Sequence, residues 1–200
     1  MIPIDITMAL FIEKAEAVSA IVQPVATLQE ALEYTVRLCE QKEACQLVTA
    51  GGEPPPEVCT KTIAAPQLSD DQKTALETLC RDKAIQVLDH GLRNHLAGID
   101  IGLTYTDFGI ADTGTLVIDS SREEIRLATM ISEIHVALLH RENIRQTSYD
   151  LEKELAGYLG QSPNYTAFIT GASRTADIER VLALGVHGPL ELHILILEGN

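Results

Sequence analysis

The sequence contains no tryptophan, and aromatic residues make up only 4% of its 200 positions. A core without large aromatic side chains must be filled by leucine, isoleucine, valine and alanine, and hydrophobic residues as a whole reach 46%. A chain of this length can bury such a core without a metal or a disulfide to hold it together. We therefore expect one globular domain over residues 1–200.

Positive charge is also scarce, because 15 lysines and arginines face 29 aspartates and glutamates, a net charge of −14. Proteins that bind nucleic acid need a positive footprint, so we expect no nucleic-acid partner. No apolar stretch reaches the roughly 18 residues of a membrane span. The first five residues hold an acid and no basic cluster, unlike a signal peptide. The sequence thus predicts a cytoplasmic protein without a membrane span.

Cysteine is sparse, and its four occurrences form no C-x-x-C pair. They are Cys39, Cys45, Cys59 and Cys80. Their spacing fits no common zinc or iron–sulfur pattern, so we expect no metal and no bound cofactor. Dinucleotide, Walker A and nucleophile-elbow motifs are absent as well. Cys39 and Cys80 fall on apolar helical stripes and are expected to be small buried hydrophobes.

The apolar residues that are present alternate between helical and strand patterns. Residues 1–24 have a weak helical period and predict a helical lead-in. Capping-box spacing at Thr27 and Ser69 predicts that helices begin there. Further helices are expected at 123–130, 148–159 and 175–184, and strands at 46–50, 58–64, 85–88, 99–103, 108–118, 134–139, 165–170 and 192–197. This alternation indicates an α/β fold with a mostly parallel sheet.

A first glycine-containing segment, Asp112-Thr113-Gly114-Thr115, lies at a predicted strand. Glycine permits a close backbone approach, and the two threonine hydroxyls can donate to an anion. Thr113, Gly114 and Thr115 are therefore candidate anion-binding residues, and Asp112 is a candidate acid or base. The same residue types also suit a β-bulge or a strand bend, so both explanations stand.

A second segment begins at Gly171, where a predicted strand ends and a helix is expected from about Ser173. Helix N-termini attract anions, and open α/β sheets bind ligands at the carboxyl ends of their strands. We expect Gly171, Ser173, Arg174 and Thr175 to bind an anion, with Arg174 as a bidentate clamp. Simple helix capping is the alternative. Asp177 is either an acid or base, or a charge that complements the helix dipole.

A third segment follows Gly185, which is expected to end the predicted helix. His187 then stands in a tight turn beside Gly188, a further candidate anion-binding residue. A general acid or base role for His187 and a role in holding the turn through backbone bonds both fit. His135 and His193 lie in apolar strands, and we expect them to be satisfied within the core.

In this order, the three segments resemble the LUD (lactate-utilisation) domain family. The resemblance covers residues 98–198 and rests on Thr113-Gly114-Thr115, on the run 173–179, and on the turn 185–189 with His193 beyond it. It implies a Rossmann-like, mostly parallel sheet flanked by helices, similar to the NagB/RpiA/CoA-transferase group. It also implies a role in oxidising L-lactate to pyruvate, in which three proteins act together and the other two carry the iron–sulfur clusters.

Two classes of function therefore stay open. In the first, the chain is a cluster-free component of an L-lactate oxidation system that binds a small carboxylate or phosphate, or iron–sulfur partner subunits. In the second, it is a stand-alone enzyme of the same fold group acting on a small phosphorylated or carboxylated metabolite, with His187, Asp112 or Asp177 as acid or base. A binding module without chemistry, and an oligomer, are both compatible with the sequence.

Overall fold

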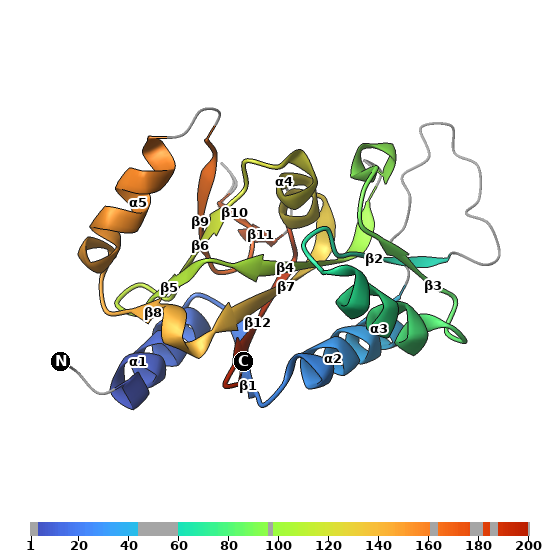
Figure 1. Cartoon of the computed structure of the whole chain (residues 1–200), viewed down its shortest axis with the longest axis horizontal. Helices are drawn as coiled ribbons and strands as arrows, with labels where there is room; N and C mark the ends of the chain where they lie inside the picture. Colours follow the sequence, from blue (N-terminus) through green and yellow to red (C-terminus); the bar gives the residue numbers. More distant parts are fainter. Residues whose placement is uncertain are drawn as a thin grey trace.

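The computed structural model describes residues 4–43, 60–95, 98–160, 164–176, 182–184 and 188–199. Within these residues, six parallel strands form a central sheet in the order β1-β12-β7-β4-β2-β3 (Figure 1). These strands are β1 (Ala20–Val25), β12 (Glu191–Leu197), β7 (Ser132–His140), β4 (Ile99–Thr106), β2 (Lys61–Ala64) and β3 (Ile85–Leu88). The prediction of a mostly parallel α/β sheet flanked by helices is confirmed.

Helices α2 (Leu28–Gln41) and α3 (Asp70–Cys80) cover one face of this sheet, and they lie side by side in Figure 1. Both begin where the capping-box spacing predicts. The hydroxyl of Thr27 accepts from the backbone N–H of Glu30, and Ser69 forms a complete capping box with Gln72. Their apolar stripes pack on side chains of β4, β7 and β12.

Cys39 and Cys80 belong to this core, as predicted, and both are free thiols. Burial raises the pKa of Cys39 to about 12 and that of Cys80 to about 11, so neither is poised to form a thiolate. Cys45 and Cys59 lie outside the described residues.

The other face carries α1 (Ile4–Ala17), α4 (Glu123–Met130) and a second sheet. In the described part this sheet has the order β8-β5-β6-β9. Its strands are β8 (Ile144–Arg145), β5 (Phe108–Ile110), β6 (Thr115–Asp119) and β9 (Thr166–Thr170). The short helix η3 (Ser148–Leu151) and α5 (Glu152–Leu159) pack on the second sheet, far from α2 and α3 (Figure 1). The remaining short helices are η1 (Leu92–His95) and η2 (Arg141–Asn143).

Three expectations about these elements were wrong. The helical lead-in ends at Ala17, because Ser19 takes a left-handed φ of 68°, and residues 20–25 form the edge strand β1. The strand expected at 108–118 is a hairpin, β5 and β6. Residues 174–176 and 182–184 form an antiparallel pair, β10 (Arg174–Ala176) with β11 (Leu182–Leu184), in place of a helix. Strands of three residues are too short to show a period, so helix propensity misled the prediction. The strand expected at 46–50 lies outside the described residues.

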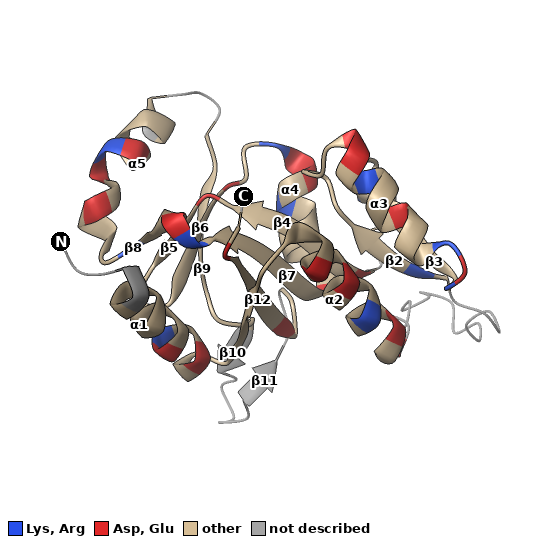
Figure 2. Cartoon of the chain, turned by 60° about the horizontal axis from the view of Figure 1, so that its bottom comes forward, with Lys and Arg blue, Asp and Glu red and all other residues tan. Residues whose placement is uncertain are grey.

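Charged residues lie mainly on the helices, while the strands of the central sheet are largely uncharged (Figure 2). Acidic residues occur on α1, α2, α3, α4 and α5 rather than in one patch (Figure 2). Among the helices of the described part, none combines the length and the apolar character needed to cross a membrane.

Candidate functional site

An open pocket of about 380 Å³ lies between β9 and the amino ends of β7 and β12. One wall is formed by β9 and the loop that follows it. The opposite wall comes from the end of α4 and from the residues that lead into β12. The lining residues are Thr129, Met130, His135, the run 167–173, Gly188, Pro189 and Leu192. Three of the predicted anion-binding residues, Gly171, Ser173 and Gly188, are therefore in its wall.

The second and third glycine-containing segments meet in this pocket. The backbone N–H of Ser173 donates to the carbonyl of Pro189 at 3.0 Å. A Cβ atom on Gly188 would lie 3.2 Å from Cβ of Ser173 and 3.4 Å from its Oγ. A glycine at position 188 thus leaves the Ser173 hydroxyl uncovered on this side. Residues 174–176 form a strand, so this segment presents no helix N-terminus to the pocket. An anion bound in the pocket would be held here by hydroxyl or N–H donors.

The other candidates of these two segments are only partly described. Arg174 and Thr175 lie in β10, of which the structure describes the backbone. Asp177 and His187 lie outside the described residues. The hypothesis that either is an acid or base stays a prediction from the sequence.

The first segment forms the turn of the β5–β6 hairpin and reaches the pocket through hydroxyl groups. The hydroxyl of Thr115 donates to Oγ1 of Thr113 at 2.8 Å and also lies 2.8 Å from Oγ1 of Thr170. Since Thr115 has one hydroxyl proton, Thr170 is the donor to Thr115. Thr170 lines the pocket, whereas Asp112 is exposed on the turn and is not among the lining residues. The threonines thus join the hairpin to the pocket wall.

Two of the candidate glycines have a structural reason to be glycine. Gly114 and Gly171 take positive φ values of 64° and 72°. A Cβ atom on Gly114 would lie 2.3 Å from the backbone nitrogen of Ala15, and one on Gly171 would lie 2.2 Å from the carbonyl oxygen of Val18. Both glycines therefore let the second sheet press against the end of α1. The bend explanation for Gly114 has this direct physical basis.

His135 forms part of the pocket from β7 and is 1% exposed. Its Nε2 lies 2.8 Å from the hydroxyl oxygen of Thr104. Burial lowers the pKa of His135 to about 4, so the ring is neutral at pH 7. The expectation that His135 is a core residue is confirmed, but the sequence reasoning missed that it also lines the pocket. The one available signal was a polar residue in an otherwise apolar strand.

His193, by contrast, is satisfied on both ring nitrogens, as predicted. Its Nδ1 lies 2.7 Å from the hydroxyl of Tyr34, and its Nε2 lies 2.9 Å from a carboxylate oxygen of Glu191. The Tyr34 contact comes from α2, on the face of the sheet opposite the pocket. His193 is therefore part of the packing of α2 on β12.

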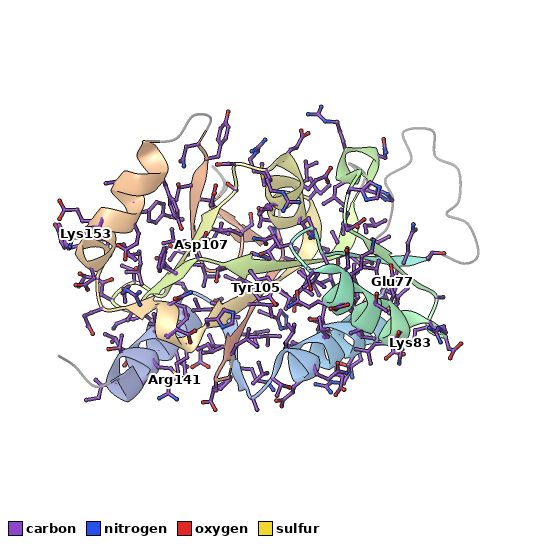
Figure 3. All side chains as sticks on the ribbon, in the orientation of Figure 1. Glu77, Lys83, Tyr105, Asp107, Arg141 and Lys153 are labelled. Carbon is purple, nitrogen blue, oxygen red and sulfur yellow. The ribbon has the colours of Figure 1, made fainter. Side chains whose placement is uncertain are left out.

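The second segment was expected at the carboxyl end of a strand, and Gly171 and Ser173 do follow the carboxyl end of β9. The pocket lies at the amino edge of the parallel sheet and not at its carboxyl edge. At that edge the ring of Tyr105, labelled in Figure 3, stacks on His140 with centroids 6.0 Å apart. The hydroxyl of Tyr105 accepts from the amide of Gln72 at 3.2 Å. β9 is an antiparallel strand of the second sheet, and its carboxyl end lies beside the amino edge of the parallel strands.

Comparison with known proteins adds independent information. The family model of the LUD domain matches residues 8–197. Lactate utilization protein C of Halalkalibacterium halodurans is 28% identical over 130 residues, covering 62% of this chain and 56% of that protein. Its counterpart in Geobacillus sp. is 30% identical over 103 residues, covering 49% of this chain and 42% of that protein. The chain thus spans about half the length of the curated relatives it matches.

One solved structure has the same fold. It is the crystal structure of a DUF162 family protein from Deinococcus radiodurans, with a TM-score of 0.64 at 14% sequence identity. The alignment covers 99% of this chain and 100% of that chain. At this identity the likeness supports the fold alone.

Proposed function

This chain belongs to the LUD domain family, and we propose from this premise that it is a component of a lactate-utilisation system that binds a small carboxylate in the pocket beside β9. The observation that carries the proposal is the meeting of Gly171, Ser173 and Gly188 in one pocket. The pocket volume is at the lower end of the range for small-molecule sites, which favours a small ligand.

The lining suits a short 2-hydroxy or 2-oxo acid. Ser173 contributes a hydroxyl group that can donate to a carboxylate oxygen. The hydroxyls of Thr129 and Thr170 donate within the protein, so they offer a ligand only acceptor lone pairs. Leu192 and Ile169 provide an apolar wall for a methyl group. The lining described here contains no lysine or arginine, and Arg174 follows Ser173 directly in the sequence. We propose Arg174 as the cation that pairs with the carboxylate.

Replacing Ser173 with alanine is expected to weaken the binding of L-lactate or pyruvate about 10-fold or more, because a hydrogen bond to a charged group contributes about 1.5–3 kcal/mol. Isothermal titration calorimetry on the purified full chain measures this. Ser148→Ala is the matched control, since Ser148 is exposed on η3 and does not line the pocket. A wild-type chain that binds neither acid, or equal affinities for all three proteins, would contradict the proposal.

The outer edge of β9 is a candidate binding surface for a partner subunit. In the described part, β9 pairs with β6 on one side and ends the second sheet. Such an edge offers unpaired backbone groups to another chain. The side chains of Phe168 and Tyr165 are exposed here, Phe168 to 52%. We propose that an iron–sulfur partner subunit of the lactate system binds along this edge.

Phe168→Asp is expected to remove iron–sulfur proteins that co-purify with the tagged chain from its native host, because a charge at an apolar contact must be desolvated. Iron and acid-labile sulfide in the purified complex measure the association. Tyr149→Asp is the control, since Tyr149 is 87% exposed on η3, away from β9. If the chain purified alone and its deletion left growth on lactate unchanged, the proposed iron–sulfur partner would be wrong.

A further inference from the structure

The hydrogen bond between His135 and Thr104 determines which ring nitrogen carries the proton. Both side chains are buried, and Thr104 has one hydroxyl proton. Within the described residues, the hydrogen-bond partner of that hydroxyl is Nε2 of His135. A buried hydroxyl proton without an acceptor costs about 1–3 kcal/mol, so Thr104 donates and Nε2 accepts. A neutral ring that accepts at Nε2 carries its proton on Nδ1.

The Nδ1–H group of His135 is reached from the pocket. The described part of the chain contains one buried side-chain polar atom without a hydrogen-bond partner, and it is Nδ1 of His140. Nδ1 of His135 has no hydrogen-bond partner among the described residues either, but unlike Nδ1 of His140 it is not fully shielded from solvent. Since His135 lines the pocket, the pocket is where Nδ1 meets solvent or a ligand.

We propose that His135 is a ligand-recognition residue whose neutral Nδ1–H donates a hydrogen bond to an acceptor oxygen, a carboxylate or 2-oxo oxygen, of the acid in this pocket. Thr104 is the positioning residue that fixes the tautomer. The proposal rests on the proposed function, because it uses the same pocket.

A neutral donor suits this position better than a charged one. An imidazolium here would be an uncompensated buried charge, and the low pKa of His135 reflects that cost. A neutral N–H needs no counter-ion in the empty pocket, where water can occupy the acceptor position. A hydrogen bond from it strengthens when a ligand excludes that water. The site therefore selects for an acceptor oxygen at a fixed place instead of for negative charge alone.

Nitrogen-15 NMR of the histidine-labelled full chain tests the tautomer without a ligand. We expect His135 to show a protonated Nδ1 and an unprotonated Nε2 at pH 7. The Nδ1 resonance is expected to move when sodium pyruvate is added. A protonated Nε2, or an Nδ1 resonance that saturating pyruvate leaves in place, overturns the proposal.

Substitutions at positions 135 and 104 distinguish the effect of the Nδ1–H donor from the effect of the ring's packing. His135→Leu is expected to weaken pyruvate binding about 10-fold or more, and His135→Asn, whose amide nitrogen can replace Nδ1, to recover most of the loss. Thr104→Val is expected to release the tautomer and weaken binding while leaving the ring in place. If His135→Leu does not fold, pyruvate binding by His135→Asn and Thr104→Val still tests the proposal.

The outcomes distinguish this inference from the proposed function. If Ser173→Ala weakens pyruvate binding and His135→Leu, folded, binds as the wild type does, the role of His135 is wrong and the carboxylate pocket stands. If the wild type binds neither lactate nor pyruvate, the proposed function fails and the ligand role of His135 fails with it.

Discussion

Replacing Gly171 with alanine is expected to lower the free energy of unfolding by about 2–5 kcal/mol. A left-handed φ costs a non-glycine residue about 1–2 kcal/mol, and overpacking adds about 1–3 kcal/mol. At Gly171 both apply, because φ is 72° and the new Cβ would lie 2.2 Å from the carbonyl oxygen of Val18. That atom is backbone, so it cannot move aside as the tip of a side chain can. Urea unfolding monitored by circular dichroism measures the change.

Gly157→Ala is the matched control for this substitution. Gly157 lies in α5, and a Cβ atom there would meet nothing within 4 Å. Alanine is expected to raise the free energy of unfolding by about 0.5–1 kcal/mol, because glycine is a poor helix former. If Gly171→Ala lowered the free energy of unfolding no more than Gly157→Ala does, the end of β9 would not pack on the turn after α1 as described.

The glycines of the sequence motifs are needed for packing as well as for shaping the candidate site. Gly114 and Gly171 were singled out as candidate anion-binding residues, and both are required by contacts with residues 15 and 18. Those contacts join segments about a hundred residues or more apart, which a local pattern cannot show. The motif therefore combines two functions: these glycines dock the second sheet on α1, and Ser173 and Gly188 shape the pocket that docking creates.

Local signals predicted local structure well. The capping boxes at Thr27 and Ser69 satisfy backbone donors within one helical turn, so the sequence alone located both helix starts. Apolar runs located β7 and β12 because a parallel strand is buried on both faces. The helix predicted over 175–184 was wrong for the opposite reason, because residues 174–176 and 182–184 form the strands β10 and β11. Each strand has three residues, and pairing between them decides the structure that propensity alone would make helical.

The candidate site was predictable only in its parts. The glycines, Ser173 and the threonines drew attention because their types suit anions and turns. His135 did not, because its role depends on Thr104 in a neighbouring strand and on the pocket in front of it. The sequence also could not show that the pocket lies at the amino edge of the parallel strands, because nothing local reveals that β9 runs antiparallel in a second sheet.

The other large effect is expected at an ion-pair cluster at the end of α2. Nζ of Lys42 lies 2.7 Å from Oδ1 of Asp100 and 3.0 Å from Oε2 of Glu133. The side chains of Lys42 and Asp100 are only 9% and 5% exposed. The other carboxylate oxygen of Asp100 accepts from the backbone N–H of Thr62 at 2.8 Å. The cluster thus ties α2 to β2, β4 and β7 in a region with little solvent.

Lys42→Met is expected to lower the free energy of unfolding by about 3–5 kcal/mol, because it removes the Lys42 cation from a buried ion pair with Asp100. Lys83→Met is the matched control. Lys83 pairs with Glu40 at 2.7 Å, but both side chains are more than a third exposed, and such pairs contribute about 0–1 kcal/mol. Urea unfolding of both variants at pH 7 measures the difference, and equal losses would show that the Lys42 cluster contributes no more than a surface pair.

The pH dependence of the same comparison tests the cause. Burial alone would lower the pKa of Lys42, but hydrogen bonds and charge attraction from Asp100 and Glu133 outweigh it, and the pKa is raised. A raised pKa in the folded state means that the contribution of the pair is complete at neutral pH and is lost as pH rises through that pKa, above the usual lysine value of about 10.4. The difference between wild type and Lys42→Met should therefore stay constant from pH 7 to 9 and shrink above it. A difference that does not change up to pH 11.5 would assign the loss to packing of the lysine stem instead of to its charge.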